Sequence, residues 1–386
     1  MLRILSSCAV FVIIASVLCL DAFAVYPDVS AASAVLIEAQ TGQVLYEHNA
    51  YKQRSMASTT KIMTSLLALE AHSPSMKITV TEEMAAVEGT SMGLLAGDTV
   101  TLKDLVYGML LQSGNDAANT VAYVLGDSPE GFAELMNKRA EQIGMTQTNF
   151  VTASGLDDKE HYSTAYDMAL LAREAMKNPE FRSICNVKNK KLSYGNPPYL
   201  RTLTNHNRLL NIYEYAVGIK TGYTKKSGRC LVSAAEKDGV LLIAVTLNAP
   251  DDWNDHVKMY EYGFSLLESV ELDSTLDAIN LPVVGGKSAT VALALAQTPR
   301  AVLPDGNSTV TRDVYLKPFE YAPVSTGDVV GEAVYRVGDR EICRTAIVAA
   351  ESVLSRTLTV VKEESEQKKA NFFTKIINKI KTFFLK

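Results

Sequence analysis

The spacing of hydrophobic and polar positions predicts strands at both ends of the segment between residues 34 and 267, with helices between them. Residues 34–47 form two β-rich runs around a turn at Thr41-Gly42, and apolar strands separated by turns follow from 217 to 247. Helical patterns cover 57–71, 102–124, 132–143, 166–176 and about 255–267. Because the strands come from both ends, we expect an α+β domain whose sheet joins distant parts of the chain.

The composition changes after about Ser269. Residues 270–361 contain short β-rich runs with Pro and Gly turns and little helical periodicity. This pattern predicts a small all-β domain. We therefore expect one domain over residues 25–268 and a second over residues 269–361.

Residues 1–24 have the composition of a secretory signal peptide. They begin with Arg3, continue with an apolar run from Ala9 to Leu20, and end with Ala22-Phe23-Ala24, a small-x-small cleavage site. The alternative is a membrane-spanning anchor, but the run is well short of the roughly 20 apolar residues that such a helix needs. We predict export, with cleavage after Ala24.

The C-terminal end has a different pattern. From Asn371 onward, Phe and Ile side chains fall on one face of a helix, and lysines and asparagines fill most of the other face. Such a helix is too short to cross a bilayer but suits its interface. We predict that residues 362–386 form a charged linker and an amphipathic anchor, with 370–386 on the outer face of the cytoplasmic membrane. Packing on the protein body or on a partner is the alternative.

Charge and cysteine content exclude several classes of function. The 386-residue chain has a net charge of −5 in spite of its basic tail, which argues against a nucleic-acid partner. Signal cleavage leaves Cys185, Cys230 and Cys343, an odd number that cannot all pair within one chain. These cysteines also lack metal-ligand spacing. We expect neither a metal nor a cofactor.

Ser58-Thr59-Thr60-Lys61 opens the first predicted helix. A separation of three residues puts Ser58 and Lys61 on one face, about one turn apart. A serine hydroxyl becomes a good nucleophile when a base takes its proton, and a neutral lysine amine at that distance can do so. The helix N-terminus adds N–H groups that favour a developing oxyanion. A surface helix is the commoner meaning of this spacing when it occurs alone.

Two further tripeptides carry suitable polar groups. Ser113-Gly114-Asn115 lies between an apolar helical run and a run of small residues, where a turn can project a hydroxyl and an amide into a cleft. Lys220-Thr221-Gly222 continues a predicted strand, so the lysine can supply positive charge and the threonine can bind a carboxylate. The glycine lets a ligand approach the strand edge. Lys226-Ser227-Gly228 matches the same pattern in a charged turn, and we prefer the first match.

The order of these three motifs is typical of penicillin-binding proteins and class A β-lactamases. The chain resembles the low-molecular-mass penicillin-binding proteins that are serine-type D-alanyl-D-alanine carboxypeptidases, peptidase family S11. The resemblance covers most of residues 30–268 and includes AVLIEAQTGQVLYEHNA, RSMASTTKIMT, LLAGDTVTLKDLVYGMLLQSGNDAAN, HYSTAYDMALLAREAM and GIKTGYTKKSGRCLVSAAEKDG. It implies a catalytic domain like that of serine β-lactamases and penicillin-binding proteins, followed by the β domain and the amphipathic helix.

The resemblance also implies the reaction. Ser58 would attack the carbonyl between the two terminal D-alanines of a peptidoglycan stem peptide, with Lys61 as the base. The backbone N–H groups of Ser58 and Tyr223 would form the oxyanion hole, and water would hydrolyse the acyl-enzyme. β-Lactam antibiotics would acylate the same serine.

Four further residues receive roles from the resemblance. Ser113 is expected to relay protons, and Asn115 to position the peptide. Lys220 and Thr221 would bind the terminal carboxylate beside Gly222. Lysine's reference pKa of about 10.4 must fall for a lysine to act as base, and the positive charge of Lys220 would lower the pKa of the base in the first motif.

Some positions depart from the family pattern. Val217 stands where many relatives carry Asp, and Thr152 where Asn is frequent. Some relatives use an arginine near the substrate carboxylate. The aligned position here is His206, with Arg208 two residues later. That His206 is an ordinary loop residue without a binding role is an equal alternative.

Two other functions use the same motifs. A serine β-lactamase needs an efficient deacylating group, commonly a Glu near the site, and the stretch around residues 150–170 is poor in acids. A catalytically silent, membrane-bound penicillin-binding scaffold would not need the intact set of Ser58, Lys61, Ser113, Asn115 and Lys220. The carboxypeptidase is therefore the preferred hypothesis.

Overall fold

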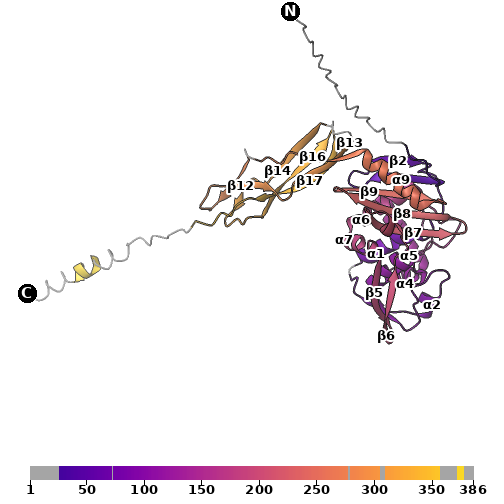
Figure 1. The fold of residues 1–386 in the computed structure, drawn as a ribbon. Helices are drawn as coiled ribbons and strands as arrows, with labels where there is room; N and C mark the ends of the chain where they lie inside the picture. The colour runs from indigo at the N-terminus through magenta and orange to yellow at the C-terminus, as the bar shows by residue number, and fades with distance from the viewer. Residues whose placement is uncertain (1–25, 72, 277–278, 305–308, 357–371, 378–386) are drawn as a thin grey trace, which may run out of the picture. The chain divides into compact units, whose positions relative to one another are not determined.

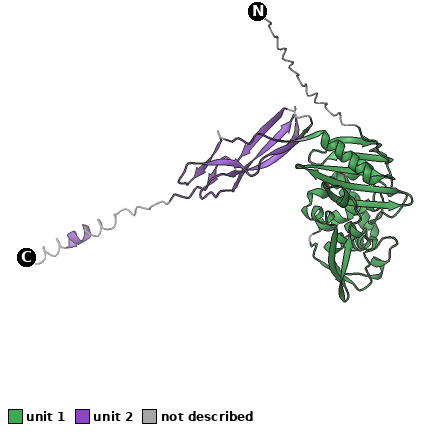
Figure 2. Cartoon of the chain, in the orientation of Figure 1, with its two compact units in different colours: residues 1–270, 302–308 green, residues 271–301, 309–386 purple. Residues whose placement is uncertain are grey.

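The structure is a computed structural model that describes residues 26–71, 73–276, 279–304, 309–356 and 372–377. It divides into two compact units, Met1–Val270 with Val302–Ser308 and Glu271–Ala301 with Thr309–Lys386 (Figure 2). The predicted signal peptide and most of the predicted tail lie outside the described residues. Within the tail, residues 372–377 are helical and exposed. None of the described helices is long and apolar enough to cross a membrane.

The first unit is built around a five-stranded antiparallel sheet with the strand order β2-β1-β9-β8-β7 (Figure 1). Its strands are β1 (Ser33–Glu38), β2 (Val44–His48), β7 (Ala216–Thr224), β8 (Gly228–Lys237) and β9 (Val240–Leu247). β1 pairs with β9 from the opposite end of the unit. The predicted α+β arrangement, with a sheet that joins distant parts of the chain, is therefore confirmed.

Different helices cover the two faces of this sheet because side chains alternate along a strand. On β1, Val35 and Ile37 belong to the core shared with the main group of helices, whereas Ala34 and Leu36 belong to a second core with α9 (Asp252–Ser265). The main group comprises η1 (Ala57–Thr60), α1 (Lys61–Glu70), α3 (Leu102–Gln112), α4 (Asn115–Gly126), α5 (Pro129–Ile143), α6 (Ala165–Lys177) and α7 (Pro179–Cys185).

Several elements differ from the predicted ones. The helical stretch expected over 102–124 consists of two helices, because Ser113 adopts a left-handed conformation with φ of 60°. α7 and the hairpin of β5 (Asn189–Gly195) and β6 (Pro198–Thr204) were not predicted. The hairpin is largely exposed and lacks a strong apolar alternation. The remaining short elements are α2 (Glu82–Ala85), α8 (Leu209–Ile212), β3 (Lys77–Thr79) and β4 (Thr99–Thr101).

The second unit contains a six-stranded sheet with the order β14-β16-β17-β12-β11-β15. The strands are β11 (Asn280–Val284), β12 (Thr290–Leu295), β14 (Val310–Leu316), β15 (Glu320–Tyr321), β16 (Val329–Val337) and β17 (Arg340–Ala349). β10 (Leu267–Glu271) and β13 (Arg300–Pro304) form a two-stranded pair that is not part of this sheet. The described residues between 271 and 356 contain no helix. The predicted all-β architecture is therefore confirmed.

Candidate active site

Ser58 and Lys61 lie where a 3-10 turn passes into a helix. η1 ends at Thr60, and α1 begins at Lys61. Residues three apart are eclipsed in a 3-10 turn, so the lysine side chain returns to the serine. Lys61 Nζ lies 3.0 Å from Ser58 Oγ, within hydrogen-bonding distance.

Lys61 is fully buried, and oxygen atoms surround its amine. Its Nζ lies 2.6 Å from Asn115 Oδ1 and 2.7 Å from the carbonyl oxygen of Ser154. Burial and then the positive charge of Lys220 lower the pKa of Lys61 well below its usual value, against the opposing charge of Asp116. A lowered pKa increases the fraction of neutral amine, which is the form that can accept a proton from a serine.

The Ser113-Gly114-Asn115 tripeptide forms the sharp junction between α3 and α4. Because Ser113 is left-handed, α3 ends there, and α4 begins two residues later at Asn115. A neighbouring loop is bonded to this junction: Thr90 Oγ1 donates to the Ser113 carbonyl at 2.6 Å, and Asn115 Nδ2 donates to the Glu88 carbonyl at 2.7 Å. These bonds fix the Asn115 amide so that its oxygen points at Lys61.

The Lys220-Thr221-Gly222 tripeptide lies on β7, the edge strand beside η1. A Cβ added at Gly222 would lie only 3.0 Å from the backbone nitrogens of Ser58 and Thr59. A larger residue would therefore push the strand away from the serine. Lys220 is buried, and this burial lowers its pKa to about 7. The strand thus brings a second lysine and a free edge to the site.

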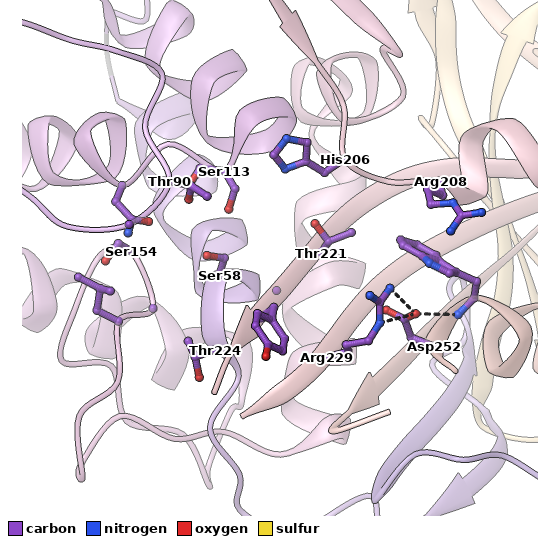
Figure 3. Close-up of a pocket in the computed structure, with 17 residues that line it drawn as sticks. Ser58, Thr90, Ser113, Ser154, His206, Arg208, Thr221, Thr224, Arg229 and Asp252 are labelled. Carbon is purple, nitrogen blue, oxygen red and sulfur yellow. Dashed lines mark hydrogen bonds and ion pairs between the residues drawn. The ribbon is translucent and has the colours of Figure 1, made fainter. Parts of the chain in front are cut away.

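These motifs meet at a cleft of about 500 Å³ (Figure 3). Ser58, Ser113, Asn115, Thr221, Gly222 and Tyr223 of the predicted set line it. Lys61 and Lys220 lie buried rather than on its surface. The Tyr223 ring is largely exposed. The sequence motifs therefore converge on one place in the first unit.

The competing tripeptide Lys226-Ser227-Gly228 does not line this cleft. Ser227 instead exchanges hydrogen bonds with Thr224 in the turn after β7. Thr152, at one of the departures from the family pattern, accepts a hydrogen bond from the Gly155 N–H at 3.1 Å.

Several residues on the cleft were not predicted as site residues. His206 and Arg208 line it, as do Arg229, Asp252 and Trp253. Arg229 binds Asp252 through Nε and Nη2, and its guanidinium lies 5.4 Å from the Trp253 ring centroid. Figure 3 shows Arg208, Arg229 and Asp252 on the Thr221 side of the cleft. Only the short spacing of His206 and Arg208 near the family's arginine position offered a signal in the sequence.

Asp116 fixes the loop that borders the cleft. It is buried, and its carboxylate accepts hydrogen bonds from Ser91 Oγ at 2.6 Å and from the N–H groups of Met92 and Leu94, both at 2.9 Å. The loop and the Asn115 junction are thus joined by one side chain. Asp116 directly follows the predicted tripeptide, but its partners lie more than 20 residues earlier in the chain.

A buried histidine is hydrogen-bonded to the 3-10 turn that carries Ser58. His161 Nδ1 accepts a hydrogen bond from the Val151 N–H at 2.9 Å, so Nε2 carries the proton and donates to Thr60 Oγ1 at 2.8 Å. Thr60 Oγ1 in turn donates to the Ala57 carbonyl at 2.8 Å. Burial lowers the pKa of His161 to about 4, which keeps the ring neutral near pH 7. Ala57, with φ of 46°, immediately precedes Ser58.

The described residues contain no group of three or more His, Cys, Asp or Glu side chains that could hold a metal ion. Cys185, Cys230 and Cys343 are buried free thiols. Burial raises the pKa of Cys185 to about 12 and that of Cys230 to about 11. Thiols with raised pKa values are poor nucleophiles.

Comparison with known proteins assigns the family. A sequence model of the family "D-alanyl-D-alanine carboxypeptidase" matches residues 21–251, and one described as "Penicillin-binding protein 5, C-terminal domain" matches residues 269–355. The chain is similar to the D-alanyl-D-alanine carboxypeptidase DacF of Bacillus subtilis, with 33% identity over 84% of this chain and 86% of that protein. It is also 33% identical to DacC of Escherichia coli, over 85% of each protein.

Solved structures agree. The D-alanyl-D-alanine carboxypeptidase DacD of Francisella tularensis has a TM-score of 0.60 and 28% identity, covering 86% of this chain and 96% of that one. The Streptomyces K15 DD-transpeptidase has a TM-score of 0.60 and 32% identity, covering 62% of this chain and 99% of that one. The chain therefore belongs to the D-alanyl-D-alanine carboxypeptidase family, as its three motifs predicted. It is a serine-type carboxypeptidase of that family.

Proposed function

We propose that this carboxypeptidase is exported and held at the outer face of the cytoplasmic membrane, where it removes the terminal D-alanine from peptidoglycan stem pentapeptides through an acyl-enzyme on Ser58. Residues 25–268 form the catalytic domain in this proposal, and residues 269–361 form the all-β domain. Penicillins and other β-lactams acylate the same serine.

The pairing of Ser58 with a buried lysine carries the proposal. Lys61 Nζ lies 3.0 Å from Ser58 Oγ, and burial lowers the pKa of the lysine. The amine takes the hydroxyl proton as Oγ attacks the carbonyl carbon between the two D-alanines. The tetrahedral intermediate then collapses and the peptide bond breaks. The protonated Lys61 returns its proton through the Ser113 hydroxyl to the nitrogen of the terminal D-alanine, which leaves.

The oxyanion of that intermediate is bound by backbone donors in our proposal. Ser58 N–H lies at the start of η1, and the close approach of Gly222 to this nitrogen brings the following residue, Tyr223, to the same side. Two N–H groups aimed at a developing negative charge stabilise it, because they are already in position when the charge forms. Only the backbone of Tyr223 is needed, which fits the exposure of its ring.

The substrate carboxylate meets positive charge on the β7 side of the cleft. Thr221 offers its hydroxyl there, and Lys220 contributes charge from beneath the strand. Arg208 lines the same cleft and supplies a second cation. Asn115 positions the stem peptide on the other side of the cleft. Water then hydrolyses the ester of the acyl-enzyme, which frees the Ser58 hydroxyl and the shortened stem peptide.

The reaction can be tested by release of D-alanine from a diacetyl-lysyl-D-alanyl-D-alanine peptide and by labelling with fluorescent penicillin. Ser58→Ala should abolish both signals. Ser55→Ala, a matched change three residues away, should leave both intact. A covalent penicillin adduct on the Ser58→Ala protein would refute the nucleophile assignment, and slow penicillin release with no nitrocefin turnover would separate this enzyme from a β-lactamase.

The location can be tested separately. Residues 1–24 direct export, and the amphipathic end holds the processed protein on the membrane in our proposal. Deletion of residues 370–386 should move the processed protein from the membrane fraction to the soluble fraction without loss of D-alanine release. Unchanged membrane association after the deletion would refute the anchor.

A further inference from the structure

One end of the second unit exposes large apolar side chains. We call these residues the apolar tip: Val284, Phe319, Tyr321, Val329 and Leu354, with exposed fractions of 48%, 41%, 65%, 59% and 60%. Large apolar side chains that are exposed together usually mark a surface that binds a partner or a membrane.

Strand pairing shows that these residues lie at one end of the sheet. Val284 pairs with Tyr321, whose ring lies 5.3 Å from the Phe319 ring. The Lys317 N–H donates to the Val330 carbonyl, which places the start of β16 beside the short segment that joins β14 to β15. The Lys287 N–H donates to the Leu354 carbonyl, so the segment after β17 lies against the turn after β11. The four chain segments that carry these side chains therefore meet at one end of the sheet.

The chain leaves the second unit at this same end. The Arg356 N–H donates to the Gly285 carbonyl at 2.8 Å, next to Val284. Sixteen residues further on, Phe372 begins the helical turn 372–377, which exposes Phe and Ile side chains. A fully extended chain of that length spans at most about 55 Å. Anything that holds this helix at a membrane thus keeps the tip within about 55 Å of the same membrane, a distance at which the tip can reach the lipid.

We propose that the apolar tip inserts its Phe, Tyr and aliphatic side chains into the membrane interface beside the C-terminal amphipathic helix, giving the second unit its own contact with lipid. This inference rests on the membrane attachment proposed above. Aromatic side chains with a polar edge, such as Tyr321, favour the headgroup level of a bilayer.

The charges around the tip are compatible with this partner. Lys287, Lys317 and Arg356 lie on the segments that form the tip, together with Glu320, Asp328 and Glu351. Lys317 and Glu320 pair with each other at 2.7 Å. The tip is thus balanced in charge although the chain as a whole is acidic. An anionic lipid surface does not repel it, and its attraction comes from apolar burial.

The test compares three triple or quadruple variants of the processed protein on vesicles of phosphatidylethanolamine and phosphatidylglycerol. The tip variant is Phe319→Ser, Tyr321→Ser and Leu354→Ser. Its matched control removes exposed apolar side chains from the first unit: Leu95→Ser, Leu200→Ser and Ile212→Ser. The tail variant changes Phe372, Phe373, Ile376 and Ile377 to Ser.

We expect the tip variant to bind vesicles about tenfold more weakly than the wild type, because less apolar surface is removed from water. The matched control should bind as the wild type does, and both should release D-alanine normally. Weak binding of the tail variant with wild-type binding of the tip variant would overturn the tip proposal and leave the anchor standing. Wild-type protein that does not bind vesicles at all would overturn the anchor itself.

A direct probe locates the contact. Tyr321→Trp places an indole at the tip, and Leu200→Trp places one on the β5-β6 hairpin. Quenching by brominated lipid should appear for Tyr321→Trp above the signal of the native Trp253 and not for Leu200→Trp. Equal quenching of the two would overturn the proposal. Quenching of Tyr321→Trp that required an added protein partner would assign the tip to protein binding and would also overturn it.

Discussion

In the first unit Lys61, Lys220 and Asp116 are almost completely buried, whereas in the second unit Arg344 pairs with Glu332 and Glu341 on the surface of the sheet. Burying a charged group costs free energy unless it has partners, and exposed pairs gain little from each other. The first unit therefore buries charged groups, at a cost in free energy, where they serve the site. Lys220 lowers the pKa of Lys61, and Asp116 holds the loop that borders the cleft. The second unit carries exposed ion pairs that contribute little to its stability.

The largest effect is expected from Lys61→Met, which removes the buried base. The rate at which fluorescent penicillin acylates Ser58 should fall about 10³-fold, because general base catalysis contributes on that scale. The unfolding midpoint in urea should fall, because Asn115 Oδ1 and the Ser154 carbonyl lose the buried donor that the amine provides. Lys177→Met, which changes an exposed lysine on α6, is the control and should have no effect on either quantity. Acylation within tenfold of the wild type would show that another group takes the proton.

The second prediction concerns the pH dependence of stability. Burial lowers the pKa of Lys220 to about 7 in the folded protein, whereas it is about 10.4 in the unfolded chain. Between these two pH values the unfolded state binds more protons at Lys220 than the folded state does. The contribution of Lys220 to the free energy of unfolding therefore rises with pH over this range and is constant below it.

Urea unfolding measured across that range should therefore show the wild type gaining stability relative to Lys220→Met, on the order of 3 kcal/mol by pH 10. The matched control is Lys226→Met, which removes an exposed lysine from the neighbouring turn. Parallel curves for the wild type and Lys220→Met would mean that Lys220 keeps an ordinary pKa.

The spacing of nearby residues predicted the position of the catalytic groups. Contacts between residues far apart in the sequence could not be predicted from it. Ser58 and Lys61 are three residues apart, so a helical turn alone brings them together. The partners of Asp116 and of the Thr60 hydroxyl come from segments up to about a hundred residues away, and only the fold brings them close. A single sequence gives no signal for such pairs.

The elements show the same division. β1 was predicted because its apolar residues form an unbroken run in the sequence. The run is unbroken because both faces of the strand are buried. The β5-β6 hairpin was missed because it exposes most of its side chains, including lysines on β5. The break at Ser113 also followed from a left-handed residue inside an otherwise helical pattern.

The third prediction tests the histidine behind the nucleophile. His161→Ala removes the donor to Thr60 Oγ1, so the turn that carries Ser58 is held less firmly. The kcat for D-alanine release should fall about tenfold with little change in KM, because geometry at the serine changes and the carboxylate site does not.

His161→Asn keeps an amide that can accept from the Val151 N–H and should recover part of the loss. A merely structural role would lower the thermal midpoint of both variants equally and leave kcat unchanged. That outcome would remove His161 from the positioning of the nucleophile.

The smallest effect is expected in the second unit, from Arg344→Gln. This change breaks the bonds to Glu332 and Glu341, but both carboxylates are exposed and water replaces the lost partner. Neither the urea midpoint nor the rate of D-alanine release should change measurably. A clear drop in the midpoint would mean that the charges on β16 and β17 act as a network, with Arg336 and its own partner Asp313 included. In that case the contrast between the two units would lie in how their charges are screened, and the second unit should then lose stability as salt is added.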